Sequence, residues 1–128
     1  MSLALSQQAR IELARIIMDL LDHWRVTPAD QVALLGMPQG TRPRVLARYR
    51  KGTPFPDDQA CVLRAEYLLS IQESLQTTFP MNRRMDGFWL TSPNRRLDNL
   101  SPLALMLRDG LEGMEAVRTH LDCTRGWI

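Results

Sequence analysis

Hydrophobic residues recur at helical spacing over most of the chain, and no stretch longer than four residues alternates as a strand would. One apolar stripe runs through residues 7–24, and Ser6 precedes it as the expected N-cap. The stripe consists of Leu13, Ile16, Ile17, Leu20, Leu21 and Trp24. The pattern therefore predicts an all-α fold that opens with a long amphipathic helix.

A short second helix and a turn are expected next. Thr27 is placed to cap this helix and Pro28 to occupy its first position, with Val32, Leu34 and Leu35 as its apolar residues. Gly36 suits a left-handed end, and residues 37–40 form a turn. Together with the helix that follows, this resembles a helix-turn-helix, although the five or six residues of the turn exceed the usual three or four.

The third helix, expected over residues 41–51 with Gly52 as its stop, separates its side chains by type. Val45, Leu46 and Tyr49 lie on one side at about 100° per residue, and basic residues lie nearly opposite. The candidate DNA-binding residues, in a window without any acid, are Arg42, Arg44, Arg48, Arg50 and Lys51. Cations on such a helix can neutralise phosphates beside a major groove. The alternative is an ordinary solvated surface.

Composition adds a preference for arginine but little net charge. Of the 128 residues, 16 are basic, and all of these except Lys51 are Arg, while the net charge is only +2. Arg binds phosphate in a bidentate manner that Lys cannot match. A genome-wide codon bias explains the same excess, and so small a net charge does not by itself indicate a polyanionic partner.

A longer helix is expected from Asp57 or Asp58 to about Phe79, and Pro80 marks the boundary between predicted domains at residues 1–80 and 81–128. This helix is expected to bury Leu63, Tyr67, Leu68, Ile71 and Leu75. Beyond Pro80 the elements are shorter: a helix at 82–90, a turn at 92–94, a helix from Ser101-Pro102 that stops at Gly110, and a last helix at 113–121.

Candidate chemistry is sparse. The two histidines, His23 and His120, and the two cysteines, Cys61 and Cys123, have no metal-ligand spacing. No nucleophile elbow, glycine-rich phosphate loop or H-E-x-x-H motif is present. We therefore expect no metal, no cofactor and no enzymatic activity. Two cysteines make no disulfide framework, and no apolar run approaches the roughly 18 residues of a membrane helix, so a cytoplasmic location is expected.

Two aromatic pairs need separate explanations. Trp89, next to Phe88, is expected in the core of a small helical domain. Trp127 and Ile128 are large apolar residues near the end of the sequence, where chains usually fray. Either this segment folds back onto the protein, or it inserts into a partner, where Trp and the adjacent Arg125 are frequent interface anchors.

Residues 88–128 carry an ordered pattern: the string FWLTSPNRRLDNLSPLALMLRDG, followed by Val117, Leu121 and Gly126. This pattern resembles the toxin-binding domain of the Xre/MbcA/ParS antitoxin family. The preceding segment resembles the Xre-type helix-turn-helix bundle of these antitoxins. The resemblance implies an antitoxin that binds and occludes a RES-domain toxin, an enzyme that depletes NAD. It also implies repression of its own operon, as a homodimer or as a hetero-oligomer with the toxin.

The resemblance further implies site residues in the C-terminal domain. The segment that would occlude the toxin's active-site cleft consists of Arg125, Gly126, Trp127 and Ile128. The residues that would shape the docking domain are Trp89, Pro93, Asn94, Pro102 and Gly110. The competing interpretation is a stand-alone helix-turn-helix transcription regulator without a toxin partner.

Overall fold

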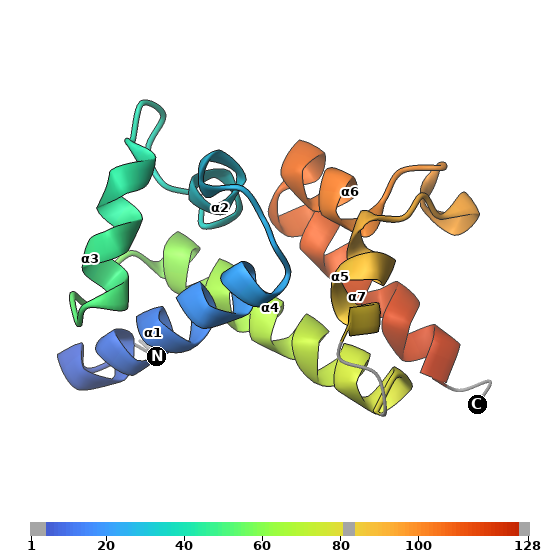
Figure 1. Ribbon diagram of the computed structural model, residues 1–128, viewed down its shortest axis with the longest axis horizontal. Helices are drawn as coiled ribbons and strands as arrows, with labels where there is room; N and C mark the ends of the chain where they lie inside the picture. Colours follow the sequence, from blue (N-terminus) through green and yellow to red (C-terminus); the bar gives the residue numbers. More distant parts are fainter. Residues whose placement is uncertain (1–4, 81–83, 126–128) are drawn as a thin grey trace. The chain divides into compact units, whose positions relative to one another are not determined.

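The computed structural model describes residues 5–80 and 84–125, and over these residues it consists of helices joined by short turns (Figure 1). An isolated bridge between Asn94 and Leu100 is the only β-type pairing within the described ranges. The predicted all-α fold is confirmed. The chain divides into two compact units, Met1–Glu66 and Tyr67–Ile128.

The first unit contains three α-helices and the beginning of a fourth. They are α1 (Gln7–His23), α2 (Pro28–Leu34), the 3₁₀ turn η1 (Pro43–Val45) leading into α3 (Leu46–Arg50), and the first part of α4 (Gln59–Thr78). Two predicted N-caps are present: the Ser6 side chain accepts a hydrogen bond from the backbone N–H of Ala9, and that of Thr27 accepts one from Asp30. These bonds satisfy backbone donors that a helix start leaves without partners.

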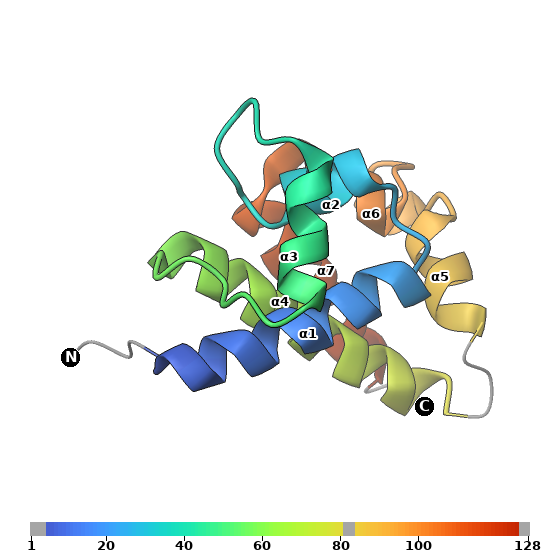
Figure 2. The ribbon, with the colours of Figure 1, turned by 60° about the vertical axis from the view of Figure 1, so that its left-hand side comes forward.

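The helix α3 packs across α1 in this unit (Figure 2). Tyr49 of α3 meets Phe55 edge-on, with ring centroids 5.0 Å apart. The largest fully buried side chains of the unit are Ile17, Met18, Leu21, Trp24, Leu34, Leu35, Leu46 and Phe55. This core therefore holds α1, α2 and α3 together through side chains that lie far apart in the sequence.

Two residues expected in the core are exposed instead. The side chain of Ile16 is 52% exposed on α1, because the buried stripe includes Ala14 and Met18 and is therefore rotated away from Ile16 relative to the predicted one. Leu63 is 38% exposed because it lies two residues from Cys61 and from Ala65, on the opposite side of α4. Both predictions were wrong because a continuous apolar pattern does not show where the packed face ends.

The second unit contains the rest of α4, then α5 (Arg84–Thr91), the 3₁₀ turn η2 (Arg95–Leu97), α6 (Pro102–Asp109) and α7 (Leu111–Arg125). The helices α6 and α7 lie side by side (Figure 1). A Cβ atom on Gly113 would lie 2.4 Å from the Leu105 carbonyl oxygen, so only glycine permits this approach. Gly113, predicted to start the last helix, lies inside α7, which starts two residues earlier at Leu111.

The two units divide inside α4, between Glu66 and Tyr67. The predicted domain boundary at residue 80 lies after the end of α4 at Thr78. Within the second unit, α4 contacts α7 through Tyr67, whose ring faces the Arg118 guanidinium at 5.6 Å. It also contacts α5, since Gln72 donates a hydrogen bond of 2.9 Å to Asp86.

The two cysteines lie in different environments. Cys61 is buried on α4, and this burial, with a smaller contribution from the charge of Asp58, raises the pKa of its thiol to about 11. Cys123 is exposed near the end of α7. Because the thiolate is the reactive form of cysteine, Cys61 is chemically inert at neutral pH.

Candidate functional site

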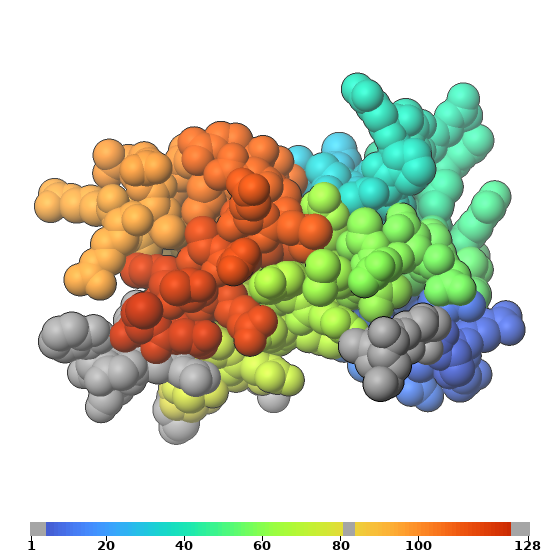
Figure 3. All heavy atoms as spheres, turned by 180° about the vertical axis from the view of Figure 1, so that it is seen from behind, coloured from blue at the N-terminus to red at the C-terminus, as the bar shows by residue number. Residues whose placement is uncertain are grey.

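Four of the five candidate DNA-binding residues lie exposed on the segment that runs from Arg42, the N-cap of η1, to Lys51, the C-cap of α3. Arg42, Arg44, Arg48 and Lys51 are all exposed, and they take part in none of the ion pairs found among the described residues. We call these four residues the cationic face. Figure 3 shows long side chains projecting from the segment coloured teal to green, which contains them.

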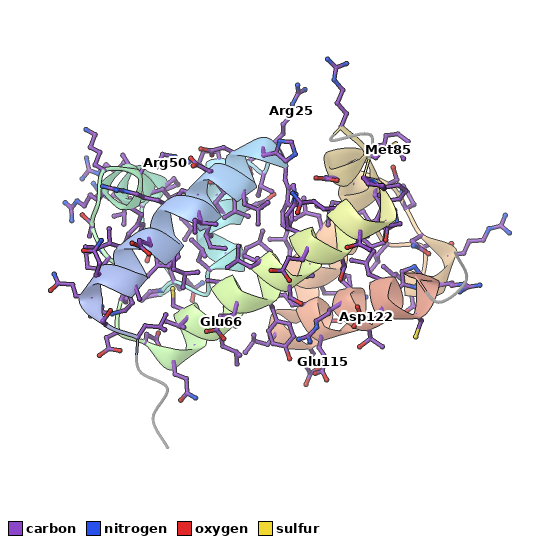
Figure 4. The ribbon with its side chains drawn as sticks, turned by 90° about the horizontal axis from the view of Figure 1, so that it is seen from below. Arg25, Arg50, Glu66, Met85, Glu115 and Asp122 are labelled. Atoms are coloured by element: carbon purple, nitrogen blue, oxygen red, sulfur yellow. The ribbon has the colours of Figure 1, made fainter. Side chains whose placement is uncertain are left out.

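Arg50 differs from the cationic face, although it belongs to the same window. Its Nη2 lies 2.7 Å from Asp22 Oδ1, and its Nε donates to Asp22 Oδ2 at 3.0 Å. The hydrogen bond from Arg50 is the largest influence on Asp22 and holds the pKa of that carboxyl group below its ordinary value. Arg50 thus faces α1 rather than an external ligand (Figure 4).

The turn before α3 is longer than expected. Residues 35–42, eight in number, separate the end of α2 from the start of η1. The predicted third helix begins as a 3₁₀ turn, and only Leu46–Arg50 is α-helical. Gly36 (φ +66°) and Gly40 (φ +90°) both adopt the left-handed conformation that closes this turn. Within the turn, the Thr41 hydroxyl donates a hydrogen bond of 2.6 Å to the Pro38 carbonyl oxygen.

In the second unit, Trp89, Asn94 and His120 form a cluster between α5, η2 and α7. Trp89 and Asn94 are predicted site residues, and His120 is not. The Trp89 ring stacks on His120 with 6.1 Å between centroids and 13° between planes. Asn94 Nδ2 lies 3.2 Å from His120 Nε2. Because the amide nitrogen can only donate, His120 Nε2 accepts and is unprotonated in this arrangement. Trp89 is therefore half-buried against a histidine, and not a fully buried core residue as expected.

The pKa of His120 is lowered in this cluster. Burial is the main cause, because it disfavours the charged imidazolium, and the positive charge of Arg96 adds to it. The direction agrees with the geometry, since a protonated Nε2 would face the Asn94 amide donor. The ring is thus held neutral while it supports the turn that carries Arg96.

Asn94 organises the loop of residues 94–100. Its side-chain oxygen accepts a hydrogen bond of 2.9 Å from the backbone N–H of Arg96 and so caps η2. Its backbone N–H donates to the Leu100 carbonyl oxygen, and its own carbonyl accepts from Leu97 and Asn99. Asp98 and Asn99 both have positive φ, a conformation that these two residue types tolerate better than most.

Two of the remaining docking residues, Pro102 and Gly110, lie at the two ends of α6. Pro102 is buried at the first position of α6, after the N-cap Ser101. Gly110 ends α6 at φ +63°, and its N–H donates to the Met106 carbonyl oxygen at 2.9 Å. Pro93 is exposed. Arg125 is the last residue of α7, and Gly126, Trp127 and Ile128 lie outside the described residues.

Sequence reasoning missed three exposed residues and one partly buried ring, that of His120, in the second unit. Phe88 is 64% exposed, and Arg95 and Arg96 are exposed on η2. Phe88 and Trp89 are adjacent on a helix and point about 100° apart, so the sequence alone does not show which of them faces the core. His120 could have been found from its place beside Leu121 and three residues after Val117, which are both buried on α7.

The described residues contain no group of three or more His, Cys, Asp or Glu side chains that could hold a metal ion. Among the helices of residues 5–80 and 84–125, none is long and apolar enough to cross a membrane.

Comparison with known proteins places the second candidate site in a described domain. Residues 74–126 match the family model described as the antitoxin Xre/MbcA/ParS C-terminal toxin-binding domain. The chain is also similar to the uncharacterized protein y4oB of Sinorhizobium fredii, with 34% identity over 107 residues, which is 84% of this chain and 79% of that protein. The match begins inside α4 and includes Phe88, Trp89, Asn94 and His120. The chain therefore belongs to the Xre/MbcA/ParS family of antitoxins, whose C-terminal toxin-binding domain it carries at residues 74–126.

Proposed function

We propose that this antitoxin binds a RES-type toxin and occludes its active site, so that the toxin no longer depletes NAD. The observation that carries the proposal is Phe88, a large aromatic side chain left 64% exposed inside the toxin-binding match. Burying it against a partner removes apolar surface from water, and aromatic residues are frequent anchors of protein interfaces. The inhibition is steric, and the antitoxin itself makes or breaks no bond.

The surface around Phe88 suits docking because its support is rigid. Phe88 is followed on α5 by Trp89, which stacks on His120 of α7. The Ser92 hydroxyl donates a hydrogen bond of 2.6 Å to the Phe88 carbonyl oxygen and closes the end of α5. An anchor that is already ordered loses little conformational entropy on binding, so more of the burial is expressed as affinity.

The experiment compares two exposed hydrophobic residues, one in each unit. The full chain is co-expressed with a RES-domain toxin encoded beside it, and co-purification, cell growth and cellular NAD are measured. Phe88→Ser should weaken toxin binding by about tenfold or more, as expected for an interface anchor. Ile16→Ser is the matched control, because Ile16 is 52% exposed on α1, outside the toxin-binding match, and should bind the toxin normally.

Equal binding by the Phe88→Ser and Ile16→Ser variants would show that docking does not use α5. A toxin that still depletes NAD in a complex with the wild-type chain would contradict occlusion. Deleting residues 125–128 tests the proposed occluding segment separately: NAD depletion should resume although the helicity measured by circular dichroism stays the same. Full protection by the truncated chain would exclude that segment from the mechanism.

We also propose that the first unit represses the antitoxin's own operon by binding promoter DNA. The cationic face supports this second function, since its four residues are exposed without ion pairs among the described residues. Arginine and lysine side chains on a helix beside a turn are suited to the phosphates that border a major groove. A regulator without a toxin partner would use the same surface. The two interpretations differ in whether the protein still neutralises a toxin after the cationic face is removed.

The triple variant Arg44→Ala, Arg48→Ala and Lys51→Ala separates them. Binding to the duplex upstream of the gene is measured over a salt series, in which each phosphate contact contributes about 0.9 to the slope of log K against log salt. The triple variant should lose affinity and up to about 2.7 of that slope. It should still neutralise the toxin. A salt-independent wild type would exclude phosphate binding, and loss of neutralisation would show that the surface serves the toxin instead.

A further inference from the structure

A closed polar network joins the end of α1, the middle of α2 and the end of α3. Arg50 of α3 donates to both carboxylate oxygens of Asp22 on α1, at 2.7 Å and 3.0 Å. Gln31 of α2 donates from Nε2 to Asp22 Oδ1 and to the Val26 carbonyl oxygen, each at 3.0 Å. The Gln31 Oε1 accepts from Arg50 Nη2 at 3.2 Å. We call Asp22, Gln31 and Arg50 the clamp.

The members of the clamp form their hydrogen bonds with one another and with the backbone of this unit. Gln31 is 1% exposed, and both donors and the oxygen of its amide have partners. The planar fork of Arg50 matches the Asp22 carboxylate in the bidentate geometry that it would otherwise offer to a phosphate. The side chains of Arg50 and Asp22 are 36% and 46% exposed, so the pair lies at the rim of the unit.

The third helix needs such support because it is too short to hold itself. The α-helical part of α3 has five residues, and neither η1 nor α3 has a side-chain hydrogen bond at its N-cap. Isolated helices much shorter than about 12 residues are marginal in water. Its packed side consists of Leu46 and Tyr49, which fix one face. The bidentate bond of Arg50 then fixes its C-terminal end against α1.

We propose that Arg50 is a positioning residue: with Asp22 and Gln31 it sets the orientation of α3, and thereby presents the cationic face to DNA. This inference rests on the proposed DNA binding of the first unit. It assigns an acidic residue, Asp22, a supporting role in binding a polyanion. The five basic residues of the window then divide into four that contact phosphate and one that holds the helix.

The variant Asp22→Asn distinguishes the two possible roles of Arg50 by the direction in which the affinity for DNA changes. If Arg50 contacts phosphate, the substitution frees its guanidinium and removes a negative charge, so affinity for the upstream duplex rises or stays constant. If the clamp positions α3, affinity falls by about tenfold or more, equivalent to about 1.4 kcal/mol. Asp19→Asn is the matched control, because it makes the same charge change on α1 without a hydrogen bond to Arg50, and should not reduce affinity.

A second variant and a second measurement test the clamp independently of the DNA affinity of Asp22→Asn. Arg50→Lys keeps the charge but not the fork, so it should weaken DNA binding as Asp22→Asn does; because Lys also binds phosphate less well than Arg, hydrogen exchange decides which role of Arg50 was lost. Amide hydrogen exchange at residues 46–50 of the free full chain should accelerate about tenfold or more in both variants, and not in Asp19→Asn. Unchanged exchange overturns the clamp, as does undiminished affinity. A wild type that fails to bind the duplex refutes the proposed DNA binding, and exchange alone then decides the clamp.

Discussion

Asn94 uses every hydrogen-bonding group that it has. Its backbone pairs with Leu97, Asn99 and Leu100, its side-chain oxygen caps η2, and its side-chain nitrogen meets His120 Nε2. Because the oxygen is committed to the Arg96 N–H, the amide cannot rotate to offer His120 an acceptor without losing that cap. The protonation state of one histidine is therefore tied to the shape of the loop.

The pKa of His120 should respond to Asn94 in a defined direction. In the wild type it should lie below the ordinary value of about 6.5, and Asn94→Asp should raise it, because a carboxylate favours a protonated Nε2. The titration of the His120 ring protons by NMR measures both values. A pKa for wild-type His120 at or above about 6.5 would contradict the described burial of the ring and its proximity to Arg96.

The same shift makes the stability of the protein depend on pH. Since the folded state holds His120 neutral, its contribution to the free energy of unfolding is complete above the unfolded pKa of about 6.5 and is lost as the pH falls toward the lower folded value. Urea unfolding of the wild type and of His120→Gln should therefore differ in pH dependence between about pH 7 and pH 5. Parallel pH profiles would show that His120 does not titrate in this way.

Among the elements, the α6–α7 pair depends on a glycine inside a helix. A Cβ atom at Gly113 would lie 2.4 Å from the Leu105 carbonyl oxygen and 2.9 Å from the Met106 Cα. Both are backbone atoms of α6, so the contact cannot be relieved by a side-chain rotation. Helix propensity and packing thus make opposite demands at this position.

Gly113→Ala should destabilise the protein by about 2 kcal/mol, because overpacking outweighs the roughly 1 kcal/mol that alanine gains in a helix. Thermal or urea unfolding measures the change. Ala116→Gly is the control at an exposed position of α7, where only propensity acts, and it should cost about 1 kcal/mol. A stabilised Gly113→Ala variant would mean that α6 and α7 do not approach as closely as described.

The elements were largely predictable from sequence, since their signals are local. Ser6, Thr27 and Ser101 cap the helices that their positions predicted, and Gly36 and Gly110 end them at positive φ. Interactions between distant residues were not predictable. Asp22 and Arg50 lie 28 positions apart, and nothing in the basic window distinguishes Arg50 from its neighbours. The partly α, partly 3₁₀ form of the third helix likewise follows from packing rather than from propensity.

At the scale of the whole molecule, the contacts of α4 indicate which fragment of the chain should fold and bind the toxin without the rest. Its second half contacts α7 through Tyr67 and Arg118 and α5 through Gln72 and Asp86. Ser74 also lies 3.4 Å from Asp122 of α7. The toxin-binding match begins at residue 74, in the same half of α4. We infer that the docking domain includes this half.

A fragment of residues 67–128 should fold and bind the toxin, whereas a fragment of residues 81–128 should lose both helicity and binding. The shorter fragment lacks the α4 side chains that pack on α5 and α7, and a chain of fewer than about 50 residues rarely buries enough apolar surface to fold alone. Circular dichroism and toxin pull-down compare the two. A folded and active 81–128 fragment would establish a domain boundary at residue 80 instead.

The contrast between the two cysteines has a practical consequence for all of these measurements. Cys61 is buried with a thiol pKa of about 11, whereas Cys123 is exposed two residues before the end of α7. A maleimide dye should therefore label the native protein at one position, without any engineered residue. That position lies two residues before the first residue of the segment proposed to occlude the toxin, so the fluorescence of the dye can report the arrival of the toxin in real time.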